Sequence, residues 1–330
     1  MALILARQDI RRCLNMPAAI DAMRTAFLAL YAKHVQMPQR LSIDLSAQGV
    51  ALLMPSLLQT PEHSAFSLKL LTSIADNATR GLPRSFATVL LLDSTTGQTL
   101  AILEGGWLTA MRTGAVSGLA TELMARPEAN VLALFGAGAQ APTQVWAIHT
   151  VRPLREVRVV NRSDEHFAQL VSTLRQLLGD SCPPVRRASN AREALSGASL
   201  VACATASTTP LFHARDIAAG THINAIGAFT PAMCEVDPAT LARARIAVDQ
   251  REAALVEAGD LLQALEQGQI AGPESWLELG QLASGEQPGR QSPQQITCFK
   301  SVGLAIQDLA VALYVYARAR EMGVGIEAEI

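Results

Sequence analysis

The first clear pattern of apolar and polar positions along the chain is helical. Between Met16 and Leu30, large apolar residues recur at spacings of four and three residues, which places them on one face of an α-helix. Asn15 and Pro17 stand where a helix usually begins. We therefore predict a helix over this stretch with one buried face.

The next region has the short apolar or alternating runs that are typical of β-strands. Turn residues separate these runs, and Ser94–Gly97 has the composition of a hairpin connection. Because no helical pattern interrupts the series, we predict an antiparallel sheet. Its strands are Leu41–Leu45, Val50–Met54, Ala65–Thr72, Ala87–Asp93 and Thr99–Leu103.

Near residue 118 the pattern changes to an alternation of strands and helices. Val131–Phe135 is a buried-type strand, a glycine-rich turn follows it, and Ala141–Val151 is helical. Such alternation predicts a parallel, doubly wound sheet. Further segments are the strands Glu156–Val160, Leu200–Ala204, His222–Ile226 and Ile246–Val248, the loop Gly285–Pro293 and the long helix Val302–Arg320.

Composition and charge narrow the class of protein. The chain has 330 residues, 49% of them hydrophobic, and is long enough for two domains. Its net charge of −2 and scattered basic residues argue against nucleic-acid binding. The apolar runs are too short for a signal peptide or a membrane span.

The cysteines and histidines form no recognisable framework. The five cysteines are far apart and include no CxxC pair, and the six histidines show no metal-ligand spacing. We therefore expect no disulfide framework, no metal site and a reducing, cytoplasmic environment.

The turn after the first parallel strand carries a nucleotide-binding motif. Residues 136–141 read GAGAQA, which matches GxGxxA between a strand and a helix. Gly136 permits the tight turn, Gly138 lets the backbone approach a pyrophosphate, and Ala141 allows helix and strand to pack closely. The phosphates would meet the free N–H groups of the helix. We predict a dinucleotide site here, with a mere tight turn as the alternative.

The residues after the second parallel strand bear on the choice of cofactor. NAD enzymes usually place an acid there to bind the ribose 2′-hydroxyl, whereas this chain has Asn161, Arg162 and Ser163. Because Arg162 can bind a 2′-phosphate, we predict that NADPH is preferred and NADH is possible. In the alternative interpretations, Arg162 is an ordinary exposed arginine or Asp164 turns toward the ribose.

Three basic residues in the N-terminal half are candidates for binding a carboxylate. Lys69 lies inside an apolar strand, where a lysine is costly to bury unless it is paired. Arg112 stands at a predicted helix start, and Arg40 follows a proline-containing turn. An arginine fork matches a carboxylate. The alternative for each is an ordinary salt-bridged or solvated base.

Several ordered motifs resemble the ornithine cyclodeaminase/μ-crystallin family, over essentially the whole chain. A series of motifs in the right order is a far more specific match than the glycine turn alone. The matching segments are Leu53–Pro55, Lys69, Asp76–Asn77, Gly81–Pro83, Leu108–Gly114, Gly136–Gln140, Thr205–Phe212, Gly227–Pro231 and Thr297–Asp308.

The resemblance implies an α/β fold with two domains, in a homodimer. Residues 1–118 and 299–330 would form a discontinuous α+β substrate-binding and dimerisation domain with an antiparallel sheet. Residues 119–298 would form a Rossmann-type NAD(P)-binding domain with a doubly wound parallel sheet.

The resemblance also implies roles for individual residues. Lys69 and Arg112 would be catalytic, and with Arg40 they would bind the substrate carboxylate and handle the proton. Met54 would be a wall of the substrate pocket. The motifs above and this resemblance together give the expected cofactor-binding residues Thr113, Gly136, Gly138, Ala139, Gln140, Asn161, Arg162, Ser163, Ala204, Thr205, Ala206, Gly227, Phe229, Lys300 and Ser301.

One departure from the family pattern bears on the activity. Ornithine cyclodeaminases carry an aspartate after the fifth Rossmann strand, where it handles the substrate's amino group. The corresponding segment here, Gly227–Pro231, reads GAFTP, and Phe229 takes the place of the aspartate. An aromatic ring can neither pair with an ammonium by charge nor take its proton. The segment therefore resembles the branch of the family that reduces cyclic ketimines.

We therefore predict NAD(P)H-dependent reduction of Δ1-pyrroline-2-carboxylate and/or Δ1-piperideine-2-carboxylate to L-proline or L-pipecolate. The expected partner is a small imine or amino acid that carries a carboxylate. Two alternatives from the same family are an ornithine cyclodeaminase and an alanine dehydrogenase-like amino-acid oxidoreductase. An alternative of another class is a non-catalytic, crystallin-like protein that binds NADPH or another ligand.

Overall fold

The computed structural model describes residues 1–46, 49–60 and 64–330, which form two compact units. Unit 1 comprises residues 1–112 and 304–330, and unit 2 comprises residues 113–303. A long helix, α3 (Gly105–Met124), begins in the first unit and ends in the second. The assignment of substrate binding and dimerisation to one domain and of NAD(P) binding to the other stays a prediction.

Unit 1 is built on an eight-stranded sheet with the order β16-β1-β7-β6-β5-β4-β2, in which β3 also pairs with β4. Its neighbouring strands are antiparallel, except that β1 and β7 are parallel. All five predicted strands are present, and the sheet is mixed because the N-terminal strand joins it in parallel. The strands are β1 (Ala2–Leu5), β2 (Val35–Gln36), β3 (Leu41–Ser46), β4 (Gly49–Gln59), β5 (Ser64–Ile74), β6 (Ser85–Asp93), β7 (Thr99–Glu104) and β16 (Ile326–Ala328).

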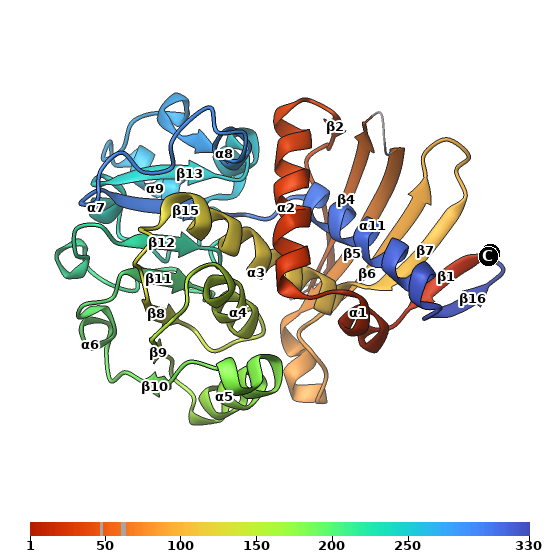
Figure 1. The fold of residues 1–330 in the computed structure, drawn as a ribbon. Coiled ribbons are helices and arrows are strands. Elements are labelled where there is room, and N and C mark those ends of the chain that lie inside the picture. Colours follow the sequence, from red (N-terminus) through yellow and green to blue (C-terminus); the bar gives the residue numbers. More distant parts are fainter. Residues whose placement is uncertain (47–48, 61–63) are drawn as a thin grey trace. The chain divides into compact units, whose positions relative to one another are not determined.

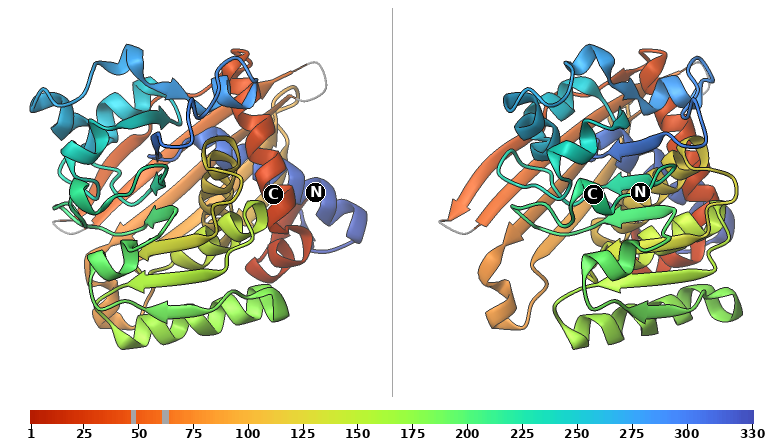
Figure 2. Two further views of the ribbon diagram at one scale, coloured as in Figure 1. Left: turned by 60° about the vertical axis from the view of Figure 1, so that its left-hand side comes forward. Right: turned by 90° about the vertical axis from the view of Figure 1, so that its left-hand side faces the viewer.

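Helices of unit 1 cover one face of this sheet (Figures 1 and 2). The longest are α2 (Met16–Tyr31) and α11 (Ala305–Met322), which contact each other, and α1 (Arg7–Cys13) packs beside α11. The side chain of Asn15 accepts a hydrogen bond from the backbone N–H of Ala18 and so caps α2. The apolar face of α2 is buried, which confirms the predicted helix. A short 3-10 helix, η1 (Ala75–Arg80), follows β5.

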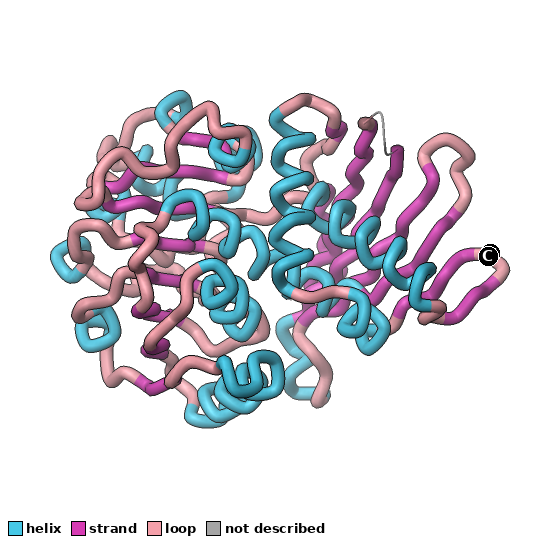
Figure 3. The backbone as a smooth tube through the Cα atoms, in the orientation of Figure 1, coloured by secondary structure: helices cyan, strands magenta, loops and turns pink. Residues whose placement is uncertain are grey.

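Unit 2 contains a fully parallel sheet with the order β10-β9-β8-β11-β12-β15-β13-β14, which confirms the predicted doubly wound fold. Figure 3 shows the alternation of its strands and helices. The strands are β8 (Val131–Phe135), β9 (Glu156–Val160), β10 (Val185–Arg187), β11 (Leu200–Cys203), β12 (His222–Ala225), β13 (Ala244–Val248), β14 (Leu277–Glu278) and β15 (Ile296–Lys300). The helices are α4 (Ala141–Val151), α5 (Asp164–Leu178), α6 (Ala191–Leu195), α7 (Pro238–Leu241), α8 (Arg251–Glu257), α9 (Gly259–Glu266) and α10 (Leu279–Ala283).

Two hydrophobic clusters enclose this sheet from its two faces. Val131, Ala133 and Phe135 of β8 belong to one cluster, and Leu132 and Leu134 belong to the other. Both faces of β8 are therefore buried, as is usual for a central strand of a parallel sheet. This explains why the strand reads as an uninterrupted apolar run.

Two predicted helix boundaries were wrong. Arg112 does not stand at a helix start, because α3 begins at Gly105, where the carboxylate of Glu104 accepts hydrogen bonds from two backbone N–H groups of the first turn. The last long helix begins at Ala305 rather than at Val302. The N–H groups that precede it are bound instead by a buried aspartate of unit 2, Asp249.

Candidate functional site

The predicted substrate residues Lys69 and Arg112 meet at a buried carboxylate in unit 1. The Nζ atom of Lys69 lies 2.6 Å from Oδ2 of Asp308, and Nε of Arg112 lies 3.2 Å from Oδ1 of the same residue. Arg112 Nη1 also donates a hydrogen bond of 2.5 Å to Oε1 of Gln307. The side chains of Lys69 and Asp308 are both 1% exposed. Two basic side chains thus share one carboxylate, so the three groups carry a net positive charge when Lys69 is protonated.

The sheet register explains how these side chains come together. Met54 of β4 lies opposite Lys69 of β5, so both side chains are on the same face of the sheet. Helix α11 contacts β4 and β5 and contributes Asp308 from its first turn. Arg40, just before β3, is half-buried and close enough for its charge to act on Lys69. The structure therefore brings the predicted substrate residues into one neighbourhood of unit 1, while their roles stay predictions.

The surroundings of Lys69 change its acidity. Burial lowers the pKa of Lys69 to about 7, because the charged form loses its hydration. The carboxylate of Asp308 raises this pKa and partly offsets burial, whereas the guanidinium groups of Arg112 and Arg40 lower it. A lysine with such a pKa can both donate and accept a proton near neutral pH.

Gln307 and Asp308 are the residues of this cluster to which the sequence analysis gave no role. Their segment, residues 305–313, reads AIQDLAVAL, in which an amide and an acid interrupt an apolar helix. Both side chains are buried. An acid in an apolar helix is the natural partner of a lysine in an apolar strand, since a buried charge requires a counter-charge. This signal could have identified Asp308 as a buried acid that needs a counter-charge, but not which base supplies it.

In unit 2, the glycine turn has the geometry that a dinucleotide requires. Gly136 follows β8 with φ of +100°, and a Cβ atom there would lie 2.6 Å from the carbonyl oxygen of Ala204. Gly138 is exposed, and a Cβ atom there would meet nothing within 4 Å. The following helix, α4, begins at Ala141. The tight turn and the open space before a helix N-terminus fit a pyrophosphate.

The order of the strands places this turn where such sheets bind ligands. From β8 the chain continues to β9 and β10 on one side of the sheet, and later to β11 and β12 on the other side. Ligands of open parallel sheets bind outside the carboxyl ends of the strands at such a reversal. The turn at Gly136 follows β8, and Ala204 follows β11, so both stand at this point.

The residues after β9 form a polar edge. Ser163 caps α5 by accepting a hydrogen bond of 3.2 Å from the N–H of His166, and Arg162 is exposed. Arg187 of the neighbouring β10 donates a 2.9 Å hydrogen bond to the carbonyl oxygen of Asn161 and pairs with the carboxylate of Asp164. The acid that could have turned toward a ribose is therefore paired with an arginine.

Several predicted cofactor residues turn inward onto buried carboxylates. Lys300 Nζ lies 2.6 Å from Oδ2 of Asp260, and Ser301 Oγ donates a 2.8 Å hydrogen bond to Asp249. Lys300 and Ser301 are almost fully buried. The hydroxyl of Thr205 also donates to a carboxylate. These contacts position loops, whereas a direct contact of these residues with a dinucleotide stays a prediction.

The remaining predicted cofactor residues differ in exposure. Phe229 is 43% exposed, and Ala206 and Ala139 are exposed as well. Thr113 is buried, and its carbonyl oxygen accepts a hydrogen bond of 3.0 Å from Gln144. Gly227 and Gln140 are half-buried.

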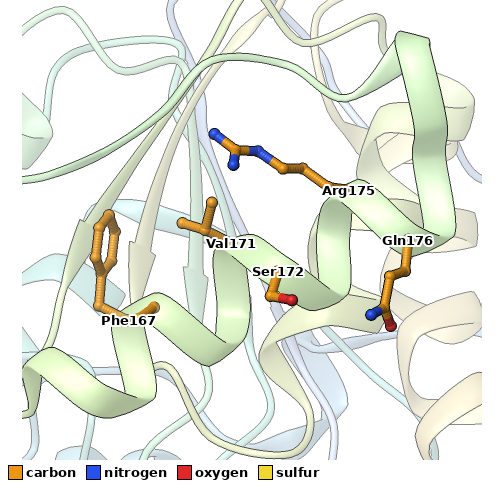
Figure 4. A pocket seen from close by; sticks show the side chains of 6 residues that line it. Phe167, Val171, Ser172, Arg175 and Gln176 are labelled. Carbon is orange, nitrogen blue, oxygen red and sulfur yellow. The ribbon is translucent and has the colours of Figure 1, made fainter.

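A hollow elsewhere in unit 2 contains none of these residues. It is open and lies on α5, between Phe167 and Gln176 (Figure 4). Across the described ranges, no three potential metal ligands of the His, Cys, Asp or Glu type gather in one place. Among the helices of the described chain, none is long and apolar enough to cross a membrane.

Comparisons with known proteins agree with this architecture. The model of the ornithine cyclodeaminase/mu-crystallin family matches residues 1–323. The chain is 37% identical over 325 residues to a Δ1-pyrroline-2-carboxylate reductase of Bacillus cereus, with 98% of each protein covered.

Two solved structures resemble the whole chain. One is a Δ1-pyrroline-2-carboxylate reductase of Thermococcus litoralis in complex with NADH and L-proline, with 34% identity and a TM-score of 0.93 over 99% of this chain and 100% of that one. The other is an archaeal alanine dehydrogenase dimer with bound NAD, with 32% identity and a TM-score of 0.90 over 99% of this chain and 99% of that one.

Proposed function

Because the chain belongs to the ornithine cyclodeaminase/mu-crystallin family, we propose that it is an NAD(P)H-dependent reductase of cyclic ketimine carboxylates. Its substrates would be Δ1-pyrroline-2-carboxylate and/or Δ1-piperideine-2-carboxylate, and its products L-proline and L-pipecolate. The observation that carries the proposal is the buried cluster of Lys69 and Arg112 around Asp308, which has the charge to bind a carboxylate and a proton to donate. The similarity to two Δ1-pyrroline-2-carboxylate reductases supports the same reaction.

The residues of unit 1 would bind the substrate and move one proton. Arg112, held by Gln307 and Asp308, offers a pre-oriented guanidinium to the carboxylate, and Arg40 adds a second positive charge. Lys69 donates a proton to the ring nitrogen, and its pKa of about 7 suits this step. The dinucleotide, when bound, supplies the hydride that adds to the C=N carbon. The C=N bond thus becomes CH–NH, with one hydride and one proton accounted for.

We propose that NADPH is preferred and that NADH is also used. Arg187 supports this preference, because it pairs with the exposed carboxylate of Asp164 and so weakens the negative charge that would repel a 2′-phosphate. Arg162 remains exposed beside it. The relatives with bound NADH and NAD support a nicotinamide cofactor in general.

We further propose a homodimer that lies in the cytoplasm. The sheet face of unit 1 opposite Lys69 carries apolar side chains that are between 44% and 56% exposed in the single chain. Apolar patches of this kind often mark protein interfaces. All five cysteines are free thiols, which fits a reducing compartment. The exposed apolar residues of this face are Leu41, Ile43, Leu70 and Phe86.

One assay distinguishes the proposal from its alternatives. Oxidation of NADPH would be followed with Δ1-pyrroline-2-carboxylate, with Δ1-piperideine-2-carboxylate, and with pyruvate plus ammonia, and the products analysed by chiral chromatography. We expect L-proline and L-pipecolate from the two ring substrates, and no proline or ammonia from L-ornithine with NAD. If pyruvate plus ammonia is turned over efficiently and the two ring substrates are not, an alanine dehydrogenase is favoured. Proline formation from ornithine would favour a cyclodeaminase, and no turnover at all would favour a binding protein.

A further inference from the structure

One buried carboxylate ties together the loops that follow two neighbouring strands of unit 2. Oε1 of Glu235 accepts hydrogen bonds from the backbone N–H and the hydroxyl of Thr205, at 2.7 and 2.8 Å. Oε2 accepts hydrogen bonds from the N–H groups of Gly227 and Ala228, at 2.7 and 3.1 Å. Thr205 lies just after β11 and Gly227 just after β12, and these strands are adjacent in the sheet. Four donors from two loops therefore converge on one side chain.

Glu235 is itself held in place by a second buried carboxylate. Oδ1 of Asp260 accepts hydrogen bonds from the N–H groups of Glu235 and Val236, at 2.6 and 2.9 Å. The other oxygen of Asp260 is paired with Lys300, at the end of β15. The segment before Glu235 also runs beside the loop after β11, since the backbone N–H of Cys234 donates to the carbonyl oxygen of Ser207. Strands β11, β12 and β15 are thereby linked at their carboxyl ends.

The packing around Gly227 leaves no room for a side chain between the two loops. A Cβ atom at Gly227 would lie 2.2 Å from the carbonyl oxygen of Thr205 and 2.5 Å from Oε1 of Glu235. On the other side, the loop after β11 touches the glycine turn, because Ala204 is the neighbour that excludes a side chain at Gly136. The loop that contains Thr205 therefore affects the carboxyl ends of both β8 and β11, where the strand order of the sheet reverses.

We infer that Glu235 is a positioning residue for the dinucleotide, which it affects through the loops after β11 and β12 rather than by contact. Glu235 is 0% exposed and cannot touch a ligand in this structure. Its carboxylate can accept from all four donors at once, whereas an amide would present an N–H group to some of them. A fixed loop geometry reduces the ordering cost of binding. This inference rests on the proposed function, because it assumes that unit 2 binds NADPH or NADH.

The decisive variant is Glu235→Gln, measured by titration of NADPH and of NADH and by thermal unfolding without ligand. We expect the Kd for the dinucleotide to rise by about tenfold or more, which equals the loss of about one charge-assisted hydrogen bond. The KM for Δ1-pyrroline-2-carboxylate should stay within about twofold, because its proposed site lies in unit 1. If Glu235 were purely structural, Glu235→Gln would lower the unfolding temperature without raising the Kd for the dinucleotide selectively over the KM for Δ1-pyrroline-2-carboxylate.

Thr205 provides a milder pair of variants in case Glu235→Gln does not fold. Thr205→Val removes one donor to Glu235, and Thr205→Ser keeps it, so only the first should weaken dinucleotide binding. The effects of Glu235→Gln and Thr205→Val should also be non-additive, since both break the same contact. Thr121→Val is the matched control, because it removes a buried hydrogen bond to Asn224 in the same unit. It should lower stability and leave the Kd within about twofold.

The outcomes separate the inference from the proposed function. If the wild-type protein binds neither NADPH nor NADH, the proposed function fails and the inference fails with it. If the wild type binds a dinucleotide and folded Glu235→Gln or Thr205→Val binds it equally well, only the inference is overturned. The inference is also overturned if Thr121→Val raises the Kd for the dinucleotide as much as Glu235→Gln does.

Discussion

At the scale of single residues, Lys69 shows how strongly the surroundings of a side chain set its chemistry. A lysine in water keeps its proton far above neutral pH. Between β5 and α11, burial lowers the pKa of Lys69 to about 7, and Asp308 prevents a further fall. The Lys69 ammonium thus forms a buried ion pair with Asp308, and in the proposed reaction it is also the proton donor. Asp308 is in this sense a positioning residue for Lys69.

This arrangement predicts a pH dependence of the reduction. The groups that act on Lys69 are Asp308, Arg112 and Arg40. If protonated Lys69 is the donor, kcat/KM for Δ1-pyrroline-2-carboxylate should fall as the pH rises through about 7. Asp308→Asn should move this fall to lower pH, because the carboxylate raises the pKa of Lys69. Lys69→Ala should remove most of the activity at every pH.

The pH profile is measured from about two units below to about two units above the pKa of Lys69, so that both protonation states are sampled. Dinucleotide binding by Asp308→Asn, measured in parallel, controls for a general loss of structure. The role of Lys69 as proton donor would be contradicted by a midpoint that Asp308→Asn leaves unchanged.

At the scale of elements, the turn from β8 to α4 contains two glycines whose backbone conformation and packing differ. Gly136 has a positive φ and is pressed against Ala204, so any side chain there disturbs the fold. Gly138 has neither constraint, since a Cβ atom there would meet open space. Folding alone therefore explains Gly136, whereas the packing of the described residues does not require a glycine at position 138.

We predict that Gly138→Ala folds normally and binds dinucleotide poorly. Its unfolding free energy should stay within about 0.5 kcal/mol of the wild type, since an exposed position without strain tolerates a methyl group. The Kd for NADPH should rise by about tenfold or more, because the methyl group would occupy the space of the pyrophosphate. Gly136→Ala is the comparison, and it should lose stability and binding together. Unchanged binding by folded Gly138→Ala would remove this turn from the site.

The prediction about cofactor choice concerns the polar residues that follow β9. We expect wild-type kcat/KM to favour NADPH by about ten- to a hundredfold, since a charge-assisted hydrogen bond to the 2′-phosphate contributes about 1.5–3 kcal/mol. Arg162→Ala should erase most of this preference. Arg155→Ala is the control, because Arg155 is exposed before the other end of β9. Equal use of both cofactors by the wild type would refute the preference, and its survival in Arg162→Ala would exclude Arg162.

At the scale of the whole molecule, the exposed apolar face of the unit 1 sheet predicts self-association. Leu70 and Phe86 lie on neighbouring strands, with Leu70 opposite Thr88 and Phe86 opposite Thr72. We expect a dimer by light scattering, and Leu70→Asp or Phe86→Asp should convert it to a monomer, because a charge buried in an interface lacks a partner. Val256→Asp, at an equally exposed apolar position in α8, should remain a dimer. Monomeric wild-type protein would disprove the proposal.

Patterns that are local in the sequence determined much of this protein. The bounds of β8, α4 and β9 follow from short runs of apolar residues and one glycine turn, and the structure reproduces all three as predicted. Their period and their turn residues are set by neighbours only a few positions away. The same locality let the sequence indicate Lys69 and Arg112 as unusual bases. It could not indicate how those bases are paired.

The pairing was decided by the tertiary structure alone. Lys69 and Asp308 are 239 positions apart, and Arg112 and Gln307 are 195 apart, so no local pattern records their contacts. Glu235 likewise meets Thr205, 30 positions away, because β11 and β12 are adjacent in the sheet. Local propensity reflects the backbone and near neighbours, whereas a buried charge is stabilised by whichever opposite charge folding brings to it. The sequence therefore determined which elements form, and the packing of those elements decided which side chains act together.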